Sequence, residues 1–220
     1  EPKAVIYDFM RMQECGEIPS DLLSLDTEKN VLVFDLGGGT LDVTIHKVGY
    51  TNTGILNIKD LAISRYTLLG GDNFDELLAA DMLKRFEEIN GIKVSIKRKE
   101  EVMCKLRKLA EKLKVDLSQA YDSARMSDIE LPEDYELEVM DIDLYDSYAY
   151  ADTYTKSDVE RIVSPLMGGK YKISDVSKIQ HMDEKEVNNI IYPILDVMDK
   201  CGKDVKIDAV ILNGGMTKFY

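Results

Sequence analysis

The stretch Asp35-Leu-Gly-Gly-Gly-Thr-Leu-Asp42 decides the fold. It follows an unbroken apolar run that begins at Val31, and it leads into Leu41 to Val48, where apolar and polar residues alternate. The first pattern predicts a strand that is covered on both faces, and the second predicts a neighbouring strand. The glycines therefore join two strands, whereas a P-loop or a dinucleotide fingerprint opens a helix.

The same turn has the composition of an anion site. Gly37, Gly38 and Gly39 carry no Cβ and can adopt positive φ, so that successive backbone N–H groups can point at one anion. Asp35 is predicted to be an outer ligand of Mg²⁺, acting through water, because a carboxylate beside phosphates needs a cation between them. The Thr40 hydroxyl is predicted to bond a terminal phosphate or to orient an attacking water. An ordinary glycine-rich hairpin is the alternative, and the flanking Asp and Thr favour phosphate binding.

Hydrophobic periodicity divides the rest of the chain into further elements. Helices are predicted at 2–13, 72–89, 99–117, 156–167 and 184–200, and strands at 55–67 and 207–212. The slipping pattern of the 55–67 strand predicts a bend or bulge, and Asp72 is expected to cap the helix that follows. Residues 122–152 predict a small antiparallel sheet with a turn at 132–134. The organisation is an α/β layer at both ends of the chain with an α+β insertion between them.

Two further glycine turns and one polar stripe are weaker signals. Gly70-Gly71 joins a strand to a helix start, where a phosphate or a sugar can bind, and Gly214-Gly215 follows the last strand. Taken alone, each is an ordinary turn. The helix at 99–117 has a polar stripe opposite its leucines, formed by Arg107, Glu111, Lys114 and Ser118. The usual interpretation of such a stripe is a solvated face with ion pairs.

Charge and cysteine usage exclude several function classes. The net charge is −13, and such a surface repels nucleic-acid backbones and anionic lipids, so neither is an expected partner. Cys15, Cys104 and Cys201 are too scattered for a disulfide framework or a zinc site and indicate a reducing compartment. The sequence shows no run of about 20 apolar residues and no signal peptide, which predicts a cytoplasmic protein. Both ends look cut, which predicts a fragment of a longer protein.

Together these stretches resemble the second lobe of the nucleotide-binding domain of heat-shock protein 70 (DnaK-type) chaperones, which belong to the actin-like ATPase superfamily. The matching segments follow the family's order: Glu1-Pro-Lys-Ala4, Asp35 to Asp42, Leu69-Gly-Gly-Asp-Asn-Phe-Asp75, Leu106 to Ser118, and Asn213-Gly-Gly-Met-Thr-Lys218. The resemblance implies an α/β, ribonuclease H-like lobe. Residues 1–70 and 154–220 would form its α/β subdomain, including an interlobe helix at 2–13, and residues 71–153 would form an inserted α+β subdomain.

The resemblance also implies a site for ATP or ADP with Mg²⁺. Asp35 and Thr40 take the catalytic positions, with Asp35 near the metal through water and Gly37 to Gly39 around the β- and γ-phosphates. The other nucleotide positions are Gly71 at the phosphates or ribose, Glu111 and Lys114 at the ribose, Ser118 at the adenine, and Gly214, Gly215 and Lys218 at the adenosine. Glu1 would lie near the site as part of the coupling between the lobes.

Some positions depart from the family pattern. The family stacks adenine between two arginines, and the matching residues here are Val115 and Lys218, neither of which stacks as well as a guanidinium. We therefore expect weaker adenine binding than in a typical member. Residues 132–155, rich in Tyr and Asp, also depart from the pattern, so partner surfaces in that region do not carry over.

The resemblance implies a parent protein in which ATP binding and hydrolysis drive protein folding as part of a stress response. Its implied partners are the other lobe of the same domain, nucleotide, and nucleotide-exchange and J-domain co-chaperones. One lobe offers half a site, so the isolated chain is expected to hydrolyse ATP negligibly. The alternative is a degenerate or filament-forming actin-like protein that acts as an assembly scaffold.

Overall fold

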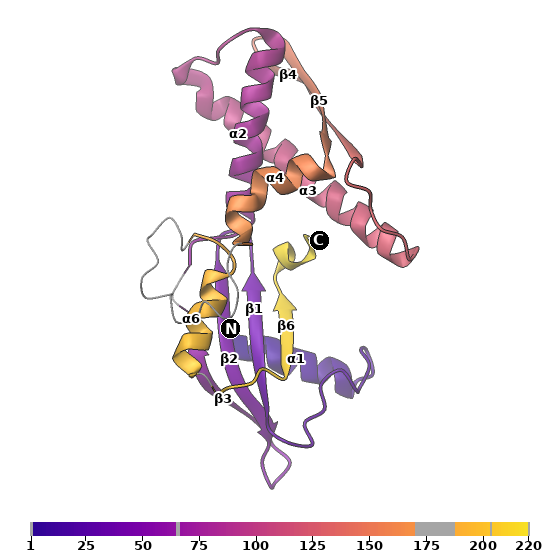
Figure 1. Ribbon diagram of the computed structural model, residues 1–220, viewed down its shortest axis with the longest axis vertical. Coiled ribbons are helices and arrows are strands. Elements are labelled where there is room, and N and C mark those ends of the chain that lie inside the picture. Colours follow the sequence, from indigo (N-terminus) through magenta and orange to yellow (C-terminus); the bar gives the residue numbers. More distant parts are fainter. Residues whose placement is uncertain (1, 65–66, 170–187, 203, 220) are drawn as a thin grey trace. The chain divides into compact units, whose positions relative to one another are not determined.

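A computed structural model describes residues 2–64, 67–169, 188–202 and 204–219 (Figure 1). The chain divides into two compact units. Unit 1 comprises Glu1–Gly70 and Gly168–Thr217, and unit 2 comprises Gly71–Met167 and Lys218–Tyr220. The 156–167 helix therefore groups with unit 2, whereas the sequence placed it with the outer layer.

Unit 1 is a four-stranded sheet with helices packed on it. Its elements are α1 (Pro2–Glu14), β1 (Lys29–Leu36), β2 (Leu41–Tyr50), β3 (Leu56–Ile63), α6 (Tyr192–Cys201) and β6 (Ala209–Asn213), followed by a 3-10 turn, η3 (Gly215–Lys218). The strand order is β3-β2-β1-β6. β1 and β2 pair antiparallel, as do β2 and β3, while β6 joins β1 in parallel.

The core of unit 1 lies between α1 and one face of the sheet. Ile6 and Met10 of α1 pack against Val31 and Val33 of β1 and Ile211 of β6, all of them buried. α6 contacts β2 and β3, and Figure 1 shows it in front of the sheet with α1 behind. Because both faces of β1 are covered, its sequence is an unbroken apolar run, as predicted.

Unit 2 combines helices with a two-stranded antiparallel sheet. Its elements are α2 (Gly71–Asn90), a short 3-10 turn η1 (Ile96–Arg98), α3 (Lys99–Met126), β4 (Glu136–Tyr145), β5 (Tyr148–Thr155) and α4 (Lys156–Met167). α3 packs against α2 and β4, and α4 packs against α2 and β5. Leu106, Leu113 and Leu117 of α3 are buried, as their helical spacing predicted, and Leu109 is half-buried.

An ionic cluster joins three elements of unit 2. The guanidinium of Arg85 in α2 lies 4.1 Å from the ring centre of Tyr154 in β5. It also forms ion pairs with Asp81 in the same helix, Asp152 in β5 and Asp158 in α4, at 2.8, 3.4 and 3.3 Å. The charge of Arg85 therefore ties α2 to both β5 and α4.

Several predicted boundaries were wrong. α3 continues to Met126, so the small sheet begins only at Glu136 rather than near 122. β3 ends at Ile63 rather than 67, and the predicted irregularity is a register shift in its pairing with β2, between Ile45 and His46. Asp72 lies within the first turn of α2, so it is not the capping residue. The helix predicted from 184 begins at Tyr192, and residues 184–187 lie outside the described part of the chain.

Candidate functional site

The glycine-rich turn closes the hairpin between β1 and β2. The N–H of Gly37 donates a hydrogen bond to the Thr40 carbonyl at 3.0 Å, which leaves Gly38 and Gly39 at an exposed tip. Within the described part of the chain, the N–H groups of Gly38 and Gly39 and the Thr40 hydroxyl form no hydrogen bond. Free N–H groups at a turn without Cβ atoms can donate to an anion that approaches the backbone closely.

The three glycines of the hairpin do not use their freedom to adopt positive φ. The described glycines with positive φ include Gly214 but none of Gly37, Gly38 and Gly39. Close packing instead explains a glycine at position 70, the residue before α2. A Cβ on Gly70 would lie 2.4 Å from the Gly38 carbonyl oxygen and 2.6 Å from the Gly39 nitrogen. The Leu41 N–H also donates to the Thr67 carbonyl at 3.1 Å, which holds the segment before Gly70 against the hairpin.

β6 brings a second turn to the same end of the sheet. Because β6 runs parallel to β1 with Asn213 opposite Asp35, both strands end together. The Asn213 amide donates to the Asp35 carboxylate at 2.9 Å, which orients this half-buried side chain. Gly214 follows with φ of +87°, and a Cβ there would lie 2.2 Å from the Leu36 carbonyl oxygen. Unit 1 thus gathers Asp35, the hairpin tip, Gly70 and Gly214 at one end of its sheet.

The turn after Gly214 is held by Thr217. The Thr217 hydroxyl and N–H both donate to the Gly214 carbonyl, at 2.7 and 3.2 Å. Gly215 is exposed, and a Cβ there would meet no atom within 4 Å. Of the two glycines predicted in this turn, only Gly214 is therefore required by close packing.

In unit 2, Lys114 is buried rather than solvated. Its ammonium donates to the Gly71 carbonyl at 3.0 Å and lies 2.8 Å from the carboxylate of Asp75. Burial raises the pKa of Asp75, and the ion pair with Lys114 opposes that rise. Ser118 donates to the Lys114 carbonyl at 3.0 Å, one turn earlier on α3. Gly71, Lys114 and Ser118 therefore lie together where α3 meets the start of α2.

The other residues of the polar stripe differ from Lys114. Glu111 is exposed, as are Val115 and Lys218 at the positions expected to stack on adenine. Arg107 is half-buried and forms ion pairs with Glu76 at 2.6 Å and Glu100 at 2.7 Å. The solvated-face interpretation thus holds for Arg107 and Glu111, while Lys114 belongs to the contact between helices.

Sequence reasoning left three structurally important residues out of the predicted site. Asn213 orients Asp35, Gly70 packs on the hairpin tip and Asp75 pairs with Lys114. Asn213 ends an apolar strand directly before Gly214, and Asp35 lies next to the end of another apolar strand, two residues before Gly37. This shared position at a strand end could have predicted that Asn213 belongs to the site. Glu1, expected near the site, lies outside the described residues.

The part of the chain that the structure describes contains no group of three or more His, Cys, Asp or Glu side chains arranged to hold a metal ion. No helix among those residues is long and apolar enough to span a bilayer.

Comparison with known proteins identifies relatives of this sequence. The family model described as "Hsp70 protein" matches residues 20–168 of this chain. The "Chaperone protein dnaK" of Cyanophora paradoxa is 38% identical over 110 residues. That alignment covers 49% of this chain and 16% of the relative, so the chain matches only a small part of that chaperone.

Proposed function

The chain belongs to the Hsp70 family, and from this premise we propose that unit 1 binds the phosphates of ATP or ADP at the turn between β1 and β2. One observation carries the proposal: three separate segments converge on the end of β1 without room for side chains. A Cβ on Gly70 or on Gly214 would overlap the backbone of Gly38 or Leu36. Such packing presents backbone rather than side chains to a ligand, which suits an anion that needs N–H donors.

Asp35 and Thr40 supply the remaining polar groups of this proposed site. Asp35 is half-buried, held by Asn213, and fits a Mg²⁺ bound through water beside the phosphates. A bound Mg²⁺ would neutralise charge on the phosphates during transfer. Thr40 is half-buried beside the hairpin tip, and its hydroxyl fits a phosphate oxygen or a water near it.

We propose that the polar stripe of unit 2 contacts the nucleoside. Glu111 is exposed and available to a ribose hydroxyl, and Ser118 takes the position implied for adenine. Lys114 acts mainly by positioning, because its ammonium is already engaged by Gly71 and Asp75. Val115 and Lys218 provide no guanidinium face, so adenine contributes less binding energy than it does in members with two arginines. Gly71 and Gly215 remain proposed backbone contacts.

At the scale of the parent protein, we propose a cytoplasmic chaperone in which ATP binding and hydrolysis drive protein folding during stress. Unit 1 would be the actin-like, ribonuclease H-like subdomain, and unit 2 the inserted one. The proposed partners are the other lobe of the domain and nucleotide-exchange and J-domain co-chaperones. The family match and the dnaK relative favour this over the alternative of an assembly scaffold.

Calorimetric titration of Mg-ADP and Mg-ATP into the full-length parent protein tests this function. We expect Asp35→Ala to weaken Mg-dependent binding at least about tenfold. Thr40→Ala should keep nucleotide binding in the titration and lower turnover in a phosphate-release assay. Thr53→Ala is the matched control, because Thr53 is an exposed threonine in the turn between β2 and β3. A parent protein that binds neither nucleotide would contradict the proposal and would revive the scaffold alternative.

A further inference from the structure

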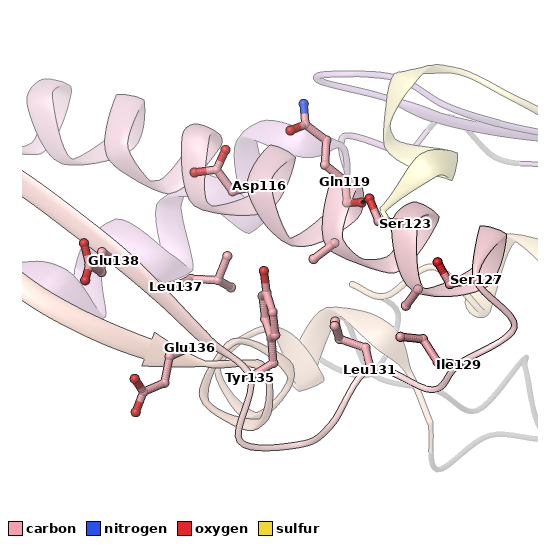
Figure 2. A pocket seen from close by; sticks show the side chains of 12 residues that line it. Asp116, Gln119, Ser123, Ser127, Ile129, Leu131, Tyr135, Glu136, Leu137 and Glu138 are labelled. Atoms are coloured by element: carbon pink, nitrogen blue, oxygen red, sulfur yellow. Dashed lines mark hydrogen bonds between the residues drawn. The ribbon is translucent and has the colours of Figure 1, made fainter.

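Unit 2 contains an open groove of about 700 Å³ that the nucleotide proposal does not use. Figure 2 shows it between the C-terminal half of α3 and the segment that leads into β4. On the α3 side, the side chains of Ala120, Ser123 and Ala124 are small, which leaves the space open. On the other side, Leu137 is buried and Tyr135 points toward α3 (Figure 2).

The groove runs along an edge of β4 rather than along one of its faces. Consecutive residues, Tyr135 to Glu138, line it. Glu136, Leu137 and Glu138 belong to β4. Side chains of a strand alternate between the two faces, so these three consecutive residues border one space only when that space lies beside the strand edge. Among the residues that the structure describes, β4 pairs only with β5, so no described strand pairs with its other edge.

The pairing of β4 with β5 shows which backbone groups face this open edge. The Lys156 N–H donates to the Tyr135 carbonyl at 2.9 Å, which makes these two residues a hydrogen-bonded pair. Bonded and non-bonded pairs alternate in an antiparallel ladder. Glu136 and Glu138, opposite Thr155 and Thr153, are therefore non-bonded pairs, and their N–H and C=O groups point away from β5.

Side-chain bonds on the partner strand agree with this assignment. The Thr153 N–H donates to the Asp152 carboxylate at 2.8 Å, and the Thr155 N–H approaches the Asp158 carboxylate at 3.4 Å. Neither N–H is directed at β4. The backbone N–H and C=O groups of Glu136 and Glu138 thus face the groove. A strand edge with unpaired N–H and C=O groups is a template for another strand.

The charges of the groove select the occupant. Its lining contains the carboxylates of Asp116, Glu136 and Glu138 and no Lys, Arg or His. Glu136 and Glu138 are exposed, and none of the three carboxylates forms an ion pair within the described residues. The chain as a whole carries −13, so a second copy would be repelled. A cationic segment is complementary to this surface.

We propose that this groove binds an extended segment of a partner protein in which Lys or Arg alternates with apolar residues, and that the segment adds to β4 as a third strand. Its backbone pairs with Glu136 and Glu138, and its basic side chains lie beside their carboxylates on one face. The intervening apolar side chains lie on the face of Leu137. Main-chain bonds of this kind supply affinity, while alternate side chains supply specificity.

The test uses the full 220-residue chain and a capped heptapeptide in which Lys alternates with Val. Isothermal titration measures affinity, and amide hydrogen exchange measures protection at Glu138. We expect binding with slower exchange of the Glu138 N–H. Glu138→Pro removes that outward N–H without removing a bond to β5, so it should lower affinity at least about tenfold while the circular dichroism spectrum is kept.

Charge reversal provides the second arm. The Glu136→Lys/Glu138→Lys protein should no longer bind the Lys/Val peptide and should bind a Glu/Val peptide of equal length. Glu88→Lys, at an exposed position of α2, is the control for a charge change elsewhere in unit 2 and should bind as wild type. Absence of binding to the Lys/Val peptide would overturn the proposal. So would binding that survives Glu138→Pro, because attraction between charges without strand addition would then suffice.

Discussion

At the scale of single residues, the end of β1 leaves no room for a side chain at position 214. A Cβ there would lie 2.2 Å from one carbonyl oxygen and 2.8 Å from the Asp35 carboxylate, at a φ of +87°. We expect Gly214→Ala to lower the free energy of unfolding by about 2 kcal/mol or more. Urea unfolding followed by circular dichroism measures this loss.

The neighbouring glycine is the control for that change. A Cβ on Gly215 meets no atom within 4 Å, and this residue does not have positive φ. Gly215→Ala should therefore change stability by less than about 0.5 kcal/mol. Equal stability losses in the two variants would mean that close packing on Leu36 is not what position 214 provides.

We expect His46 to make the stability of unit 1 depend on pH. Its ring is buried between Thr44, at 2.8 Å, and Asp60, at 2.9 Å, and Asp60 also pairs with Lys3 of α1. Burial lowers the pKa of His46 from 6.5, although Asp60 opposes that shift. The unfolded chain therefore binds a proton at a higher pH than the folded chain does. Stability should rise with pH up to about 6.5 and fall as pH drops below it.

His46→Gln isolates this effect. Between pH 7.5 and pH 5.5 we expect the wild type to lose on the order of 1 kcal/mol more stability than the variant, measured by urea unfolding at each pH. His181, the other histidine, is present in both proteins and cancels in the difference. Parallel stability profiles for the two proteins would show that the imidazole titrates equally in the folded and unfolded states.

At the scale of elements, the hydrophobic period identified helices and strands better than it placed their ends. The buried leucines of α3 recur as predicted, yet α3 continues to Met126 through residues that carry little apolar signal. The pattern of β3 slips between Asp60 and Ala62, where the pairing with β2 shifts register, and the strand ends at Ile63 rather than at 67. Local patterns report which face of an element is buried, whereas ends depend on contacts with distant segments.

The same distinction applies to the candidate site. Asp35 and the glycines were predictable, because their chemistry lies in one contiguous stretch. Asn213 and Gly70 were not, because their roles come from a parallel strand pairing and from a backbone contact distant in sequence. Lys114 was placed on a solvated stripe by spacing alone, and its burial depends on where α2 packs.

That burial gives α2 and α3 a shared ion pair. Lys114→Met should lower the free energy of unfolding by about 3 kcal/mol, because it leaves Asp75 buried without its partner. The double variant Asp75→Asn/Lys114→Met should lose clearly less, since no lone charge remains. Lys112→Met, at an exposed position two residues away, is the control and should be close to neutral. If Lys114→Met left the free energy of unfolding unchanged in the absence of nucleotide, the lysine would contribute to ligand binding and not to stability.

At the scale of the whole molecule, the question is whether this chain can hydrolyse ATP by itself. It belongs to the Hsp70 family, yet its alignment covers 16% of the dnaK relative. Phosphoryl transfer depends on groups placed around the phosphate from several sides. In the proposed site, Asp35, Thr40 and the glycine turn would supply polar groups from one lobe only. We therefore expect the 220-residue chain to hydrolyse ATP at the uncatalysed background rate, while the full-length parent turns it over.

A phosphate-release assay on both proteins, each with its Thr40→Ala variant, checks this expectation. The variant should slow the parent by about 100-fold or more, as loss of one well-placed catalytic donor does, and should leave the isolated chain unchanged at background. Turnover by the isolated chain that Thr40→Ala abolishes would show that this lobe alone completes the site. Turnover that persists in the variant would point to a contaminating ATPase, because a reaction at this turn must respond to the hydroxyl beside it.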